Sequence, residues 1–127
     1  MSVFGVGTQV VECARVAKLI DRHGEVFLLQ VFTPREVGYG RERTRTTETF
    51  AAVWAAKEAV FRALGTRWRK GMDWRDVELV FDPGGEPAAK VNGPTKELMD
   101  ARGVRIVHVA LAYTRNFATA TAVAERG

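Results

Sequence analysis

Three charged side chains, Lys57, Glu58 and Arg62, interrupt a stretch of sequence that is otherwise apolar or small. This stretch, residues 49–65, predicts a helix on which Glu58 and Arg62 lie one turn apart and Lys57 lies near the middle of the apolar face. Burying a charge without a partner costs free energy, so these groups should face each other, a cleft or a bound ion. Spacing alone slightly favours a local Glu58–Arg62 pair, with Lys57 extending its ammonium group to water. The charges indicate a site without naming its chemistry.

The helix that carries these charges is expected to be enclosed by other parts of the protein. Thr46 or Thr47 can cap its start, and Gly65 suits the left-handed residue just past its end. One face carries large apolar side chains, and the opposite face carries alanine where a surface helix would carry charge. The large residues are Phe50, Val53, Trp54, Val60, Phe61 and Leu64, and the alanines are Ala51, Ala52, Ala55, Ala56, Ala59 and Ala63. Close backbones or other subunits should cover such a helix, and because it has no solvent-facing side we predict a homotrimer.

Length and composition place the chain among ordinary single-domain proteins. Its 127 residues suffice for one modest core, and 46% of them are hydrophobic and 27% charged. No apolar run reaches bilayer-spanning length and the N-terminus lacks a signal-peptide pattern, so a cytoplasmic location and no membrane partner are expected. The single cysteine, Cys13, has no companion for a disulfide or a metal site and is expected to be a small buried hydrophobe on a helix.

The net charge of +4 is compatible with an acidic partner or a phosphate-bearing ligand. Arg15, Lys18 and Arg22 recur at helical spacing and form a basic stripe, either a solubilising face or a docking strip for an acidic partner. Two other basic clusters could track nucleic acid, but no zinc spacing, aromatic RNA-binding signature or recognition helix accompanies them. The clusters are Arg41, Arg43 and Arg45, and Arg67, Arg69 and Lys70 around Trp68. Solvated loops are the expected role for both clusters.

The order of predicted elements indicates an α+β fold with mostly antiparallel strands. Strands are predicted at residues 2–11, 77–81, 88–91, 104–112 and 117–124, and helices at 12–22, 25–32, 34–37, 49–65 and 96–102. Residues 38–47 are predicted to form a mobile connection into the central helix. Gly5 and Gly7 in the first strand indicate a close approach by another backbone or a ligand, and they lack the third glycine of a dinucleotide-binding fingerprint.

Motifs spread along nearly the whole chain resemble those of the holo-acyl-carrier-protein synthases, the small trimeric class of 4′-phosphopantetheinyl transferases. In chain order they are Gly5-Val-Gly7-Thr8-x-Val-Val-Glu12, Phe32-Thr-Pro-x-Glu36, Trp54-Ala-Ala-Lys-Glu-Ala59, Ala63-Leu-Gly-Thr66, Trp74-Arg-Asp-Val-Glu78, Gly85-x-Pro87 and His108-Val-Ala-Leu-Ala-x-Thr114. One such motif would be weak, whereas all of them in order and at matching intervals are specific. The resemblance implies one domain, residues 1–127, with a mostly antiparallel sheet packed on a central buried helix in a trimer.

The resemblance also implies an enzyme that transfers the phosphopantetheine arm of coenzyme A to a serine of an acyl carrier protein, with Mg²⁺ at the pyrophosphate. Carried over by position, Glu58 would hold the metal beside Gln9 and could orient a base water, while Lys57 and Arg62 would hold phosphate groups. Coenzyme A would also contact Gly65, Thr66, Tyr113 and Thr114. The basic stripe Arg15, Lys18 and Arg22 would match the family's first helix, which grips the carrier of fatty-acid or secondary-metabolite synthesis.

Four positions depart from the family pattern. Gln9 stands where the family has an aspartate, and its amide oxygen can touch Mg²⁺ but brings no charge. Tyr113 stands where a histidine or aspartate is common and, with a reference pKa of about 10, is a poor base near neutrality. Glu86 reverses the charge of a basic hairpin residue, and Arg62 replaces a lysine, keeping its charge but not its capacity to shuttle a proton.

These residues leave two main hypotheses. The first is an active, Mg²⁺-dependent transferase that works with one carboxylate, Glu58. The second is a relative on the same scaffold that binds coenzyme A or an acyl carrier without transferring the arm. Retention of the Lys57-Glu58 pair and of Gly65-Thr66 favours the first, while Gln9 and Tyr113 favour the second. A nucleic-acid-binding domain ranks third, and a steep salt dependence on any polyanion would identify it.

Overall fold

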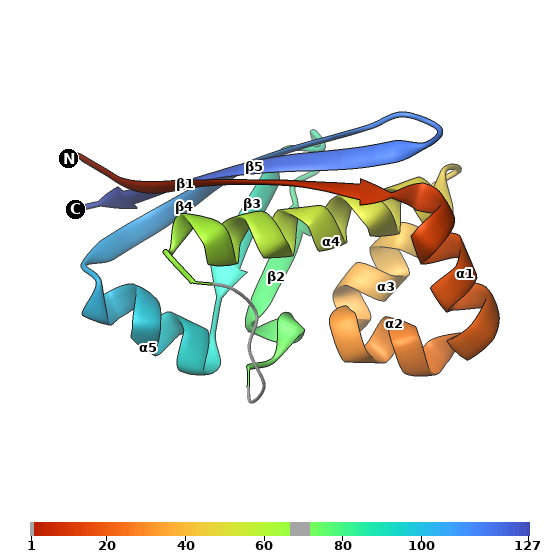
Figure 1. Ribbon diagram of the computed structural model, residues 1–127, viewed down its shortest axis with the longest axis horizontal. Helices are drawn as coiled ribbons and strands as arrows, with labels where there is room; N and C mark the ends of the chain where they lie inside the picture. Colours follow the sequence, from red (N-terminus) through yellow and green to blue (C-terminus); the bar gives the residue numbers. More distant parts are fainter. Residues whose placement is uncertain (1, 67–71) are drawn as a thin grey trace.

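The computed structural model describes residues 2–66 and 72–127, with the helices on one side of a three-stranded sheet (Figure 1). In chain order the elements are β1 Ser2–Glu12, α1 Cys13–His23, α2 Glu25–Val31, α3 Pro34–Arg41, α4 Thr46–Ala63, the 3₁₀ helix η1 Trp74–Asp76, β2 Val77–Phe81, β3 Pro87–Val91, α5 Gly93–Ala101, β4 Val104–Tyr113 and β5 Phe117–Arg126. The sheet has the spatial order β1-β5-β4, and β2 and β3 form a separate hairpin, with antiparallel pairing in both. The predicted α+β fold is confirmed for these ranges.

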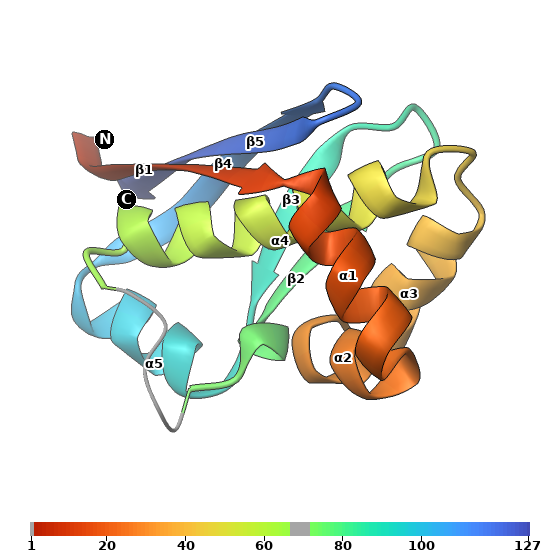
Figure 2. The same cartoon turned by 45° about the vertical axis from the view of Figure 1, so that its right-hand side comes forward.

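Helix α4 is the central element of the fold. Helices α1, α2 and α3 gather near its N-terminal end, and α5 lies near its C-terminal end (Figure 2). Between Thr49 and Ala63, every side chain of α4 is buried except those of Glu58 and Arg62. The predicted enclosed helix is therefore confirmed, and two of its three central charges remain accessible.

The sheet covers α4 at unusually short range because β1 carries glycine where it faces the helix. A Cβ added at Gly5 would overlap the backbone carbonyl oxygen of Ala63, and one added at Gly7 would overlap that of Ala59. The close backbone approach predicted for these glycines is thus observed, and the approaching backbone is α4. Opposite them, Ala118, Ala120, Ala122 and Ala124 of β5 are at most 1% exposed. The alanine-rich helix is covered by its own chain, so its burial does not by itself require other subunits.

Several predicted boundaries are wrong: for example, the helix predicted to start at residue 96 starts at Gly93, and the last strand continues to Arg126. Two further differences lie at the start of α4 and the end of α3, and a tertiary contact explains the second. Helix α4 begins at Thr46 after Arg45, without a side-chain cap, and the Thr46 hydroxyl instead donates to the Arg43 carbonyl at 2.8 Å. Helix α3 continues through Arg41, so the first part of the predicted mobile connection is helical. Gly40 allows α3 to pass close to Phe50, because a Cβ at this position would lie only 2.6 Å from the Phe50 ring. Gly65 has φ +82° and ends α4 in the predicted left-handed conformation.

The outer face of the sheet, away from α4, is rich in exposed apolar side chains. Its large members are Val3, Val6 and Val10 of β1, Ile106 of β4 and Phe117 of β5, which are 44–61% exposed. None of the labelled helices covers this side in the described part of the chain (Figure 1). No helix within the described ranges is long and apolar enough to cross a bilayer.

Candidate active site

Gln9 and Glu58 are in direct contact. Alternation along β1 turns Gly5, Gly7 and Gln9 toward α4, and the glycines let the helix approach closely enough for Glu58 to meet the strand. The Gln9 Nε2 amide donates a hydrogen bond to Glu58 Oε2, and both side chains are half-buried. The two positions predicted as metal ligands therefore lie side by side, while their metal-binding role remains a prediction.

Lys57 faces the interior instead of water or the Gln9–Glu58 pair. Its side chain is 0% exposed, its Nζ lies 2.7 Å from Glu36 Oε1, and it donates to the backbone carbonyls of Trp74 and Val77. The expectation that it reaches solvent is wrong because Glu36, buried on α3, supplies a counter-charge inside the protein. Nor does the structure place Lys57 where it could hold a phosphate, since its three donors are already used.

Glu36 is the residue that the sequence reasoning missed. Its carboxylate accepts from Lys57, from the Leu79 backbone N–H at 2.7 Å and from the Thr33 backbone N–H at 2.9 Å. Glu36 thereby joins α3, α4 and β2. Burial lowers the pKa of Lys57, and Glu36 opposes that shift. The Thr33-x-x-Glu36 spacing of a capping box, which the structure contains, was the available signal.

Arg62 follows Glu58 by one turn and is exposed. The expected Glu58–Arg62 salt bridge is not formed, and Arg62 has no ion pair within residues 2–66 and 72–127. Its guanidinium is therefore open to a ligand beside Glu58. Gly65 and the buried Thr66 follow directly, so three of the residues predicted to contact coenzyme A lie at this end of α4.

Tyr113 and Thr114 lie at the opposite edge of the sheet from Gln9. Gln9 is on β1 and Tyr113 ends β4, with β5 between them. The polar groups of Thr114 form hydrogen bonds within the β4–β5 turn. Its backbone N–H donates to the Phe117 carbonyl at 2.7 Å, and its hydroxyl accepts from the Phe117 N–H at 3.2 Å. One chain does not bring the predicted site residues into a single cluster.

Tyr113 instead borders a groove of about 520 Å³ beside the β2–β3 hairpin. Tyr39 and Phe81 stack there with ring centres 4.1 Å apart, and the Arg43 guanidinium lies 4.3 Å from the Tyr39 ring centre. A flat aromatic stack beside a cation suits a planar, anionic ligand.

The three arginines of the first predicted basic cluster have different partners. Arg43 lies against Tyr39, whereas Arg41 pairs with Glu25 and Arg45 pairs with Glu48. The second basic cluster, residues 67–70, lies outside the described residues.

Arg15, Lys18 and Arg22 are exposed along α1, as the helical spacing predicted. Arg15 also covers one face of Trp54, with its guanidinium carbon 5.3 Å from the ring centre. Cys13, at the start of α1, is 5% exposed, and burial raises the pKa of its thiol. Its expected role as a small buried hydrophobe is confirmed.

The donor set at Gln9 and Glu58 fits Mg²⁺ when a phosphate ligand completes it. Within the described ranges, no three His, Cys, Asp or Glu side chains form a metal-binding group. Mg²⁺, however, is commonly held by one or two carboxylates together with substrate phosphates and water. Glu58 supplies one carboxylate, and a rotated Gln9 amide would present its oxygen to the same ion.

The sequence and the fold were both compared with those of known proteins, and the matches identify the family of this chain. Residues 5–122 match the 4′-phosphopantetheinyl transferase superfamily. A holo-[acyl-carrier-protein] synthase from Koribacter versatilis is 36% identical over 97% of this chain and 98% of its own length. The fold matches the Neisseria meningitidis synthase with a TM-score of 0.88 at 25% identity, covering 98% of this chain and 100% of that one. It also matches a Bacillus anthracis synthase in complex with coenzyme A (3′,5′-ADP), with a TM-score of 0.80 at 28% identity over 98% of each chain. The chain therefore belongs to the holo-acyl-carrier-protein synthases, a family of transferases.

Breaking the buried Lys57–Glu36 pair should lower the free energy of unfolding more than breaking a surface pair does. Glu36→Gln leaves the Lys57 charge uncompensated, and we expect a loss of about 3–5 kcal/mol in the free energy of unfolding. Adding Lys57→Met removes that charge, so the double variant should lose less than the sum of the single losses. Urea denaturation measures both. Asp100→Asn, which breaks the exposed pair with Lys96, is the control and should cost less than about 1 kcal/mol. Additive losses would show that the two charges do not interact.

Gln9→Asp should raise the affinity for Mg²⁺ on the order of tenfold, because the added carboxylate increases the ligand charge beside Glu58. Gln9→Asn, which has the size of aspartate without its charge, is the matched control and should not raise the affinity. Calorimetric titration of Mg²⁺ into each variant measures the change. Equal affinities for the Asp and Asn variants would mean that β1 does not face the ion.

Proposed function

We propose that this protein transfers 4′-phosphopantetheine from coenzyme A to a serine of an apo acyl carrier protein in a Mg²⁺-dependent reaction. The observation that carries the proposal is the contact between Gln9 and Glu58, with the exposed Arg62 one turn away. In a member of this family, these three side chains occupy the positions expected to meet the pyrophosphate. Mg²⁺ bound there would offset the charge that develops on the leaving phosphate.

The chain's own residues have separate tasks in this reaction. The serine oxygen of the carrier attacks the phosphorus that bears the pantetheine arm, and the bond from that phosphorus to the departing adenosine 3′,5′-bisphosphate breaks. Glu58 accepts a hydrogen bond from a water, which takes the serine proton and passes one of its own to the carboxylate oxygen. Arg62 holds a phosphate oxygen by a charge-assisted hydrogen bond. Lys57 acts indirectly by fixing α4 against α3 and β2.

The accessible surface supports a complete site formed between copies of the chain in a homotrimer. Gln9 and Glu58 lie at the β1 edge of the sheet, whereas Tyr113 and the groove with Arg43 lie at the β4 edge. A neighbouring copy could place its groove beside the Gln9–Glu58 pair, where the aromatic stack would receive the adenine ring. The exposed apolar outer face of the sheet offers the interface.

The basic stripe on α1 supplies the docking surface for the acidic carrier in this proposal. Arg15, Lys18 and Arg22 project from one exposed helix face, so they present three positive charges without prior ion pairs in the described part of the chain. Opposite charge on a partner would accelerate association and select its orientation.

A second candidate is a relative that binds coenzyme A or a carrier without transferring the arm. It is supported by the uncharged Gln9 amide, which donates a hydrogen bond to the Glu58 carboxylate and brings no second negative charge to a metal.

Intact-protein mass spectrometry of an apo carrier incubated with the protein, coenzyme A and Mg²⁺ separates these candidates. We expect the wild type to add the mass of the phosphopantetheine arm and the Gln9→Asp variant to do so faster, because its metal is held more tightly. Addition by the variant alone would favour the second candidate, with a lost metal site. Addition by neither would contradict the transferase proposal.

Sedimentation velocity should show a trimer at micromolar protein concentration. Val10→Lys places a charge on the exposed outer face of the sheet and should shift the population toward monomer, because burying an unpaired charge in an interface is costly. Val26→Lys is the matched control, since Val26 is 65% exposed on α2, away from the sheet, and should leave the trimer intact. A wild type that sediments only as monomer would remove the shared site.

A further inference from the structure

The Tyr39–Phe81 stack joins two elements that are separate in the chain. Tyr39 lies on α3 and Phe81 ends β2, and their ring centres are 4.1 Å apart with planes only 4° from parallel. Both side chains are half-buried and border the groove beside the β2–β3 hairpin. The geometry of the stack, and of the groove, therefore depends on how α3 is held against β2.

Glu36 connects α3 to β2 from inside the protein. It precedes Tyr39 by one turn of α3, and its Oε2 accepts a hydrogen bond from the Leu79 backbone N–H at 2.7 Å. Leu79 precedes Phe81 by two residues on β2. Residues three apart on a helix are about 5–6 Å apart, and residues two apart on a strand are about 7 Å apart. The buried hydrogen bond and the stack are thus neighbouring contacts between the same two elements.

The Glu36 carboxylate has little freedom to move. It is 2% exposed, and its other oxygen lies 2.7 Å from Lys57 Nζ and accepts from the Thr33 backbone N–H at 2.9 Å. Lys57 is held in turn by the backbone carbonyls of Trp74 and Val77, to which it donates. Breaking any of these bonds would leave a buried polar group without its partner, which is costly.

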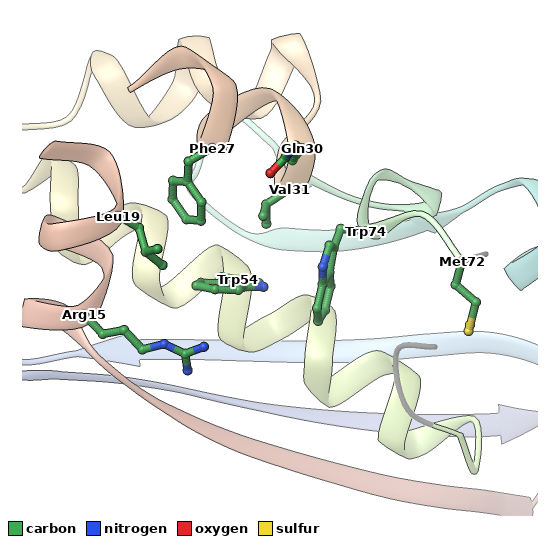
Figure 3. A pocket seen from close by; sticks show the side chains of 8 residues that line it. All are labelled: Arg15, Leu19, Phe27, Gln30, Val31, Trp54, Met72 and Trp74. Atoms are coloured by element: carbon green, nitrogen blue, oxygen red, sulfur yellow. The ribbon is translucent and has the colours of Figure 1, made fainter. Parts of the chain in front are cut away.

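The far end of this set of contacts is fixed to α4 by aromatic packing. Figure 3 shows the Trp74 ring beside that of Trp54, with ring centres 5.9 Å apart and planes at 83°. The Trp74 ring also packs against Phe61, with centres 5.7 Å apart. The Trp74 carbonyl that accepts from Lys57 is therefore held in place by α4. Contacts run without a break from α4 through Lys57 and Glu36 to the aromatic stack.

We propose that Glu36 is a positioning residue for the groove beside the β2–β3 hairpin. Its buried carboxylate sets the spacing between α3 and β2 at which Tyr39 and Phe81 stack, and so sets the affinity for the planar end of a ligand. Glu36 lies too deep to touch that ligand and acts through the two rings. That the ligand is coenzyme A rests on the proposed function, whereas the effect of Glu36 on the stack does not.

Nuclear magnetic resonance of the tyrosine rings tests the positioning in the full chain, without any ligand. The chain has two tyrosines, so Tyr113→Phe leaves only the signals of Tyr39. A stacked ring shields its neighbour, and Phe81→Leu gives the position of the Tyr39 signals without that shielding. Glu36→Asp keeps a charge for Lys57 but shortens the side chain by one methylene. We expect it to move the Tyr39 signals toward their position in Phe81→Leu.

Two further variants keep this test decisive. Glu97→Asp makes the same change at an exposed position of α5 and is the matched control, so the Tyr39 signals should stay in place. Where Glu36→Asp does not fold, Glu36→Leu combined with Lys57→Met replaces it. That double variant buries no charge and gives the Leu79 N–H no acceptor, so it should fold and displace the same signals.

The second readout is the KM for coenzyme A in the transfer reaction. Glu36→Asp should raise this KM about tenfold, as expected for the loss of one stacking contact with a base, and should leave kcat within about twofold. In the Phe81→Leu background, adding Glu36→Asp should raise the KM no further, because the stack is already lost.

Tyr39 signals that stay in place in Glu36→Asp would overturn the proposal, even for a protein that transfers nothing. A fall in kcat as large as the rise in KM would also overturn it, because Glu36 would then act on α4 as a whole. A further rise in KM in the Phe81→Leu background would have the same meaning. Displaced signals in Glu36→Asp, together with a wild type that does not bind coenzyme A, would support the positioning role and contradict only the proposed function.

Discussion

The close contact between β1 and α4 is the constraint on which the candidate site depends. Gly5 and Gly7 leave no room for a Cβ against the carbonyl oxygens of Ala63 and Ala59, so any larger residue would push the helix from the sheet. The small side chains of β5 continue the same contact surface. At that separation Gln9 reaches Glu58, although the two residues are far apart in the chain. The alanine and glycine content therefore sets the geometry of the site.

The other side of α4 is held by polar contacts. Lys57, adjacent in sequence to Glu58, is buried against Glu36 and against backbone carbonyls around η1 and β2. A buried ion pair is weak evidence for net stability, but its hydrogen bonds are directional and fix one arrangement of α3, α4 and β2. Neighbouring residues on one helix thus have different tasks: Lys57 orients the helix from within, and Glu58 faces the candidate ligand.

The sequence predicted those features of the fold that depend on the spacing of residues within one element. Period, glycine position and alanine content correctly indicated the enclosed helix, the close approach at Gly5 and Gly7, and the β2–β3 hairpin. The Lys57–Glu36 pair was missed because it joins different helices, and helical spacing reports only neighbours one turn apart. Helix α3 was predicted too short because Gly40 is a poor helix former, and only the Phe50 ring packed against it explains why the helix continues. The contact of Gln9 with Glu58 agrees with the placement implied by family resemblance, which carries positional information that composition does not.

The central claim is that Glu58 alone supplies the carboxylate chemistry of this site. Its most direct test is the initial rate of phosphopantetheine transfer to an apo carrier by Glu58→Gln, at saturating coenzyme A and Mg²⁺. Glu86→Gln, which removes an exposed hairpin carboxylate, is the control. The account predicts that Glu58→Gln lowers kcat by about 100-fold or more, the range expected for loss of a general base or its orienting group, while the control retains the wild-type rate. A Glu58→Gln variant with wild-type kcat would contradict the account.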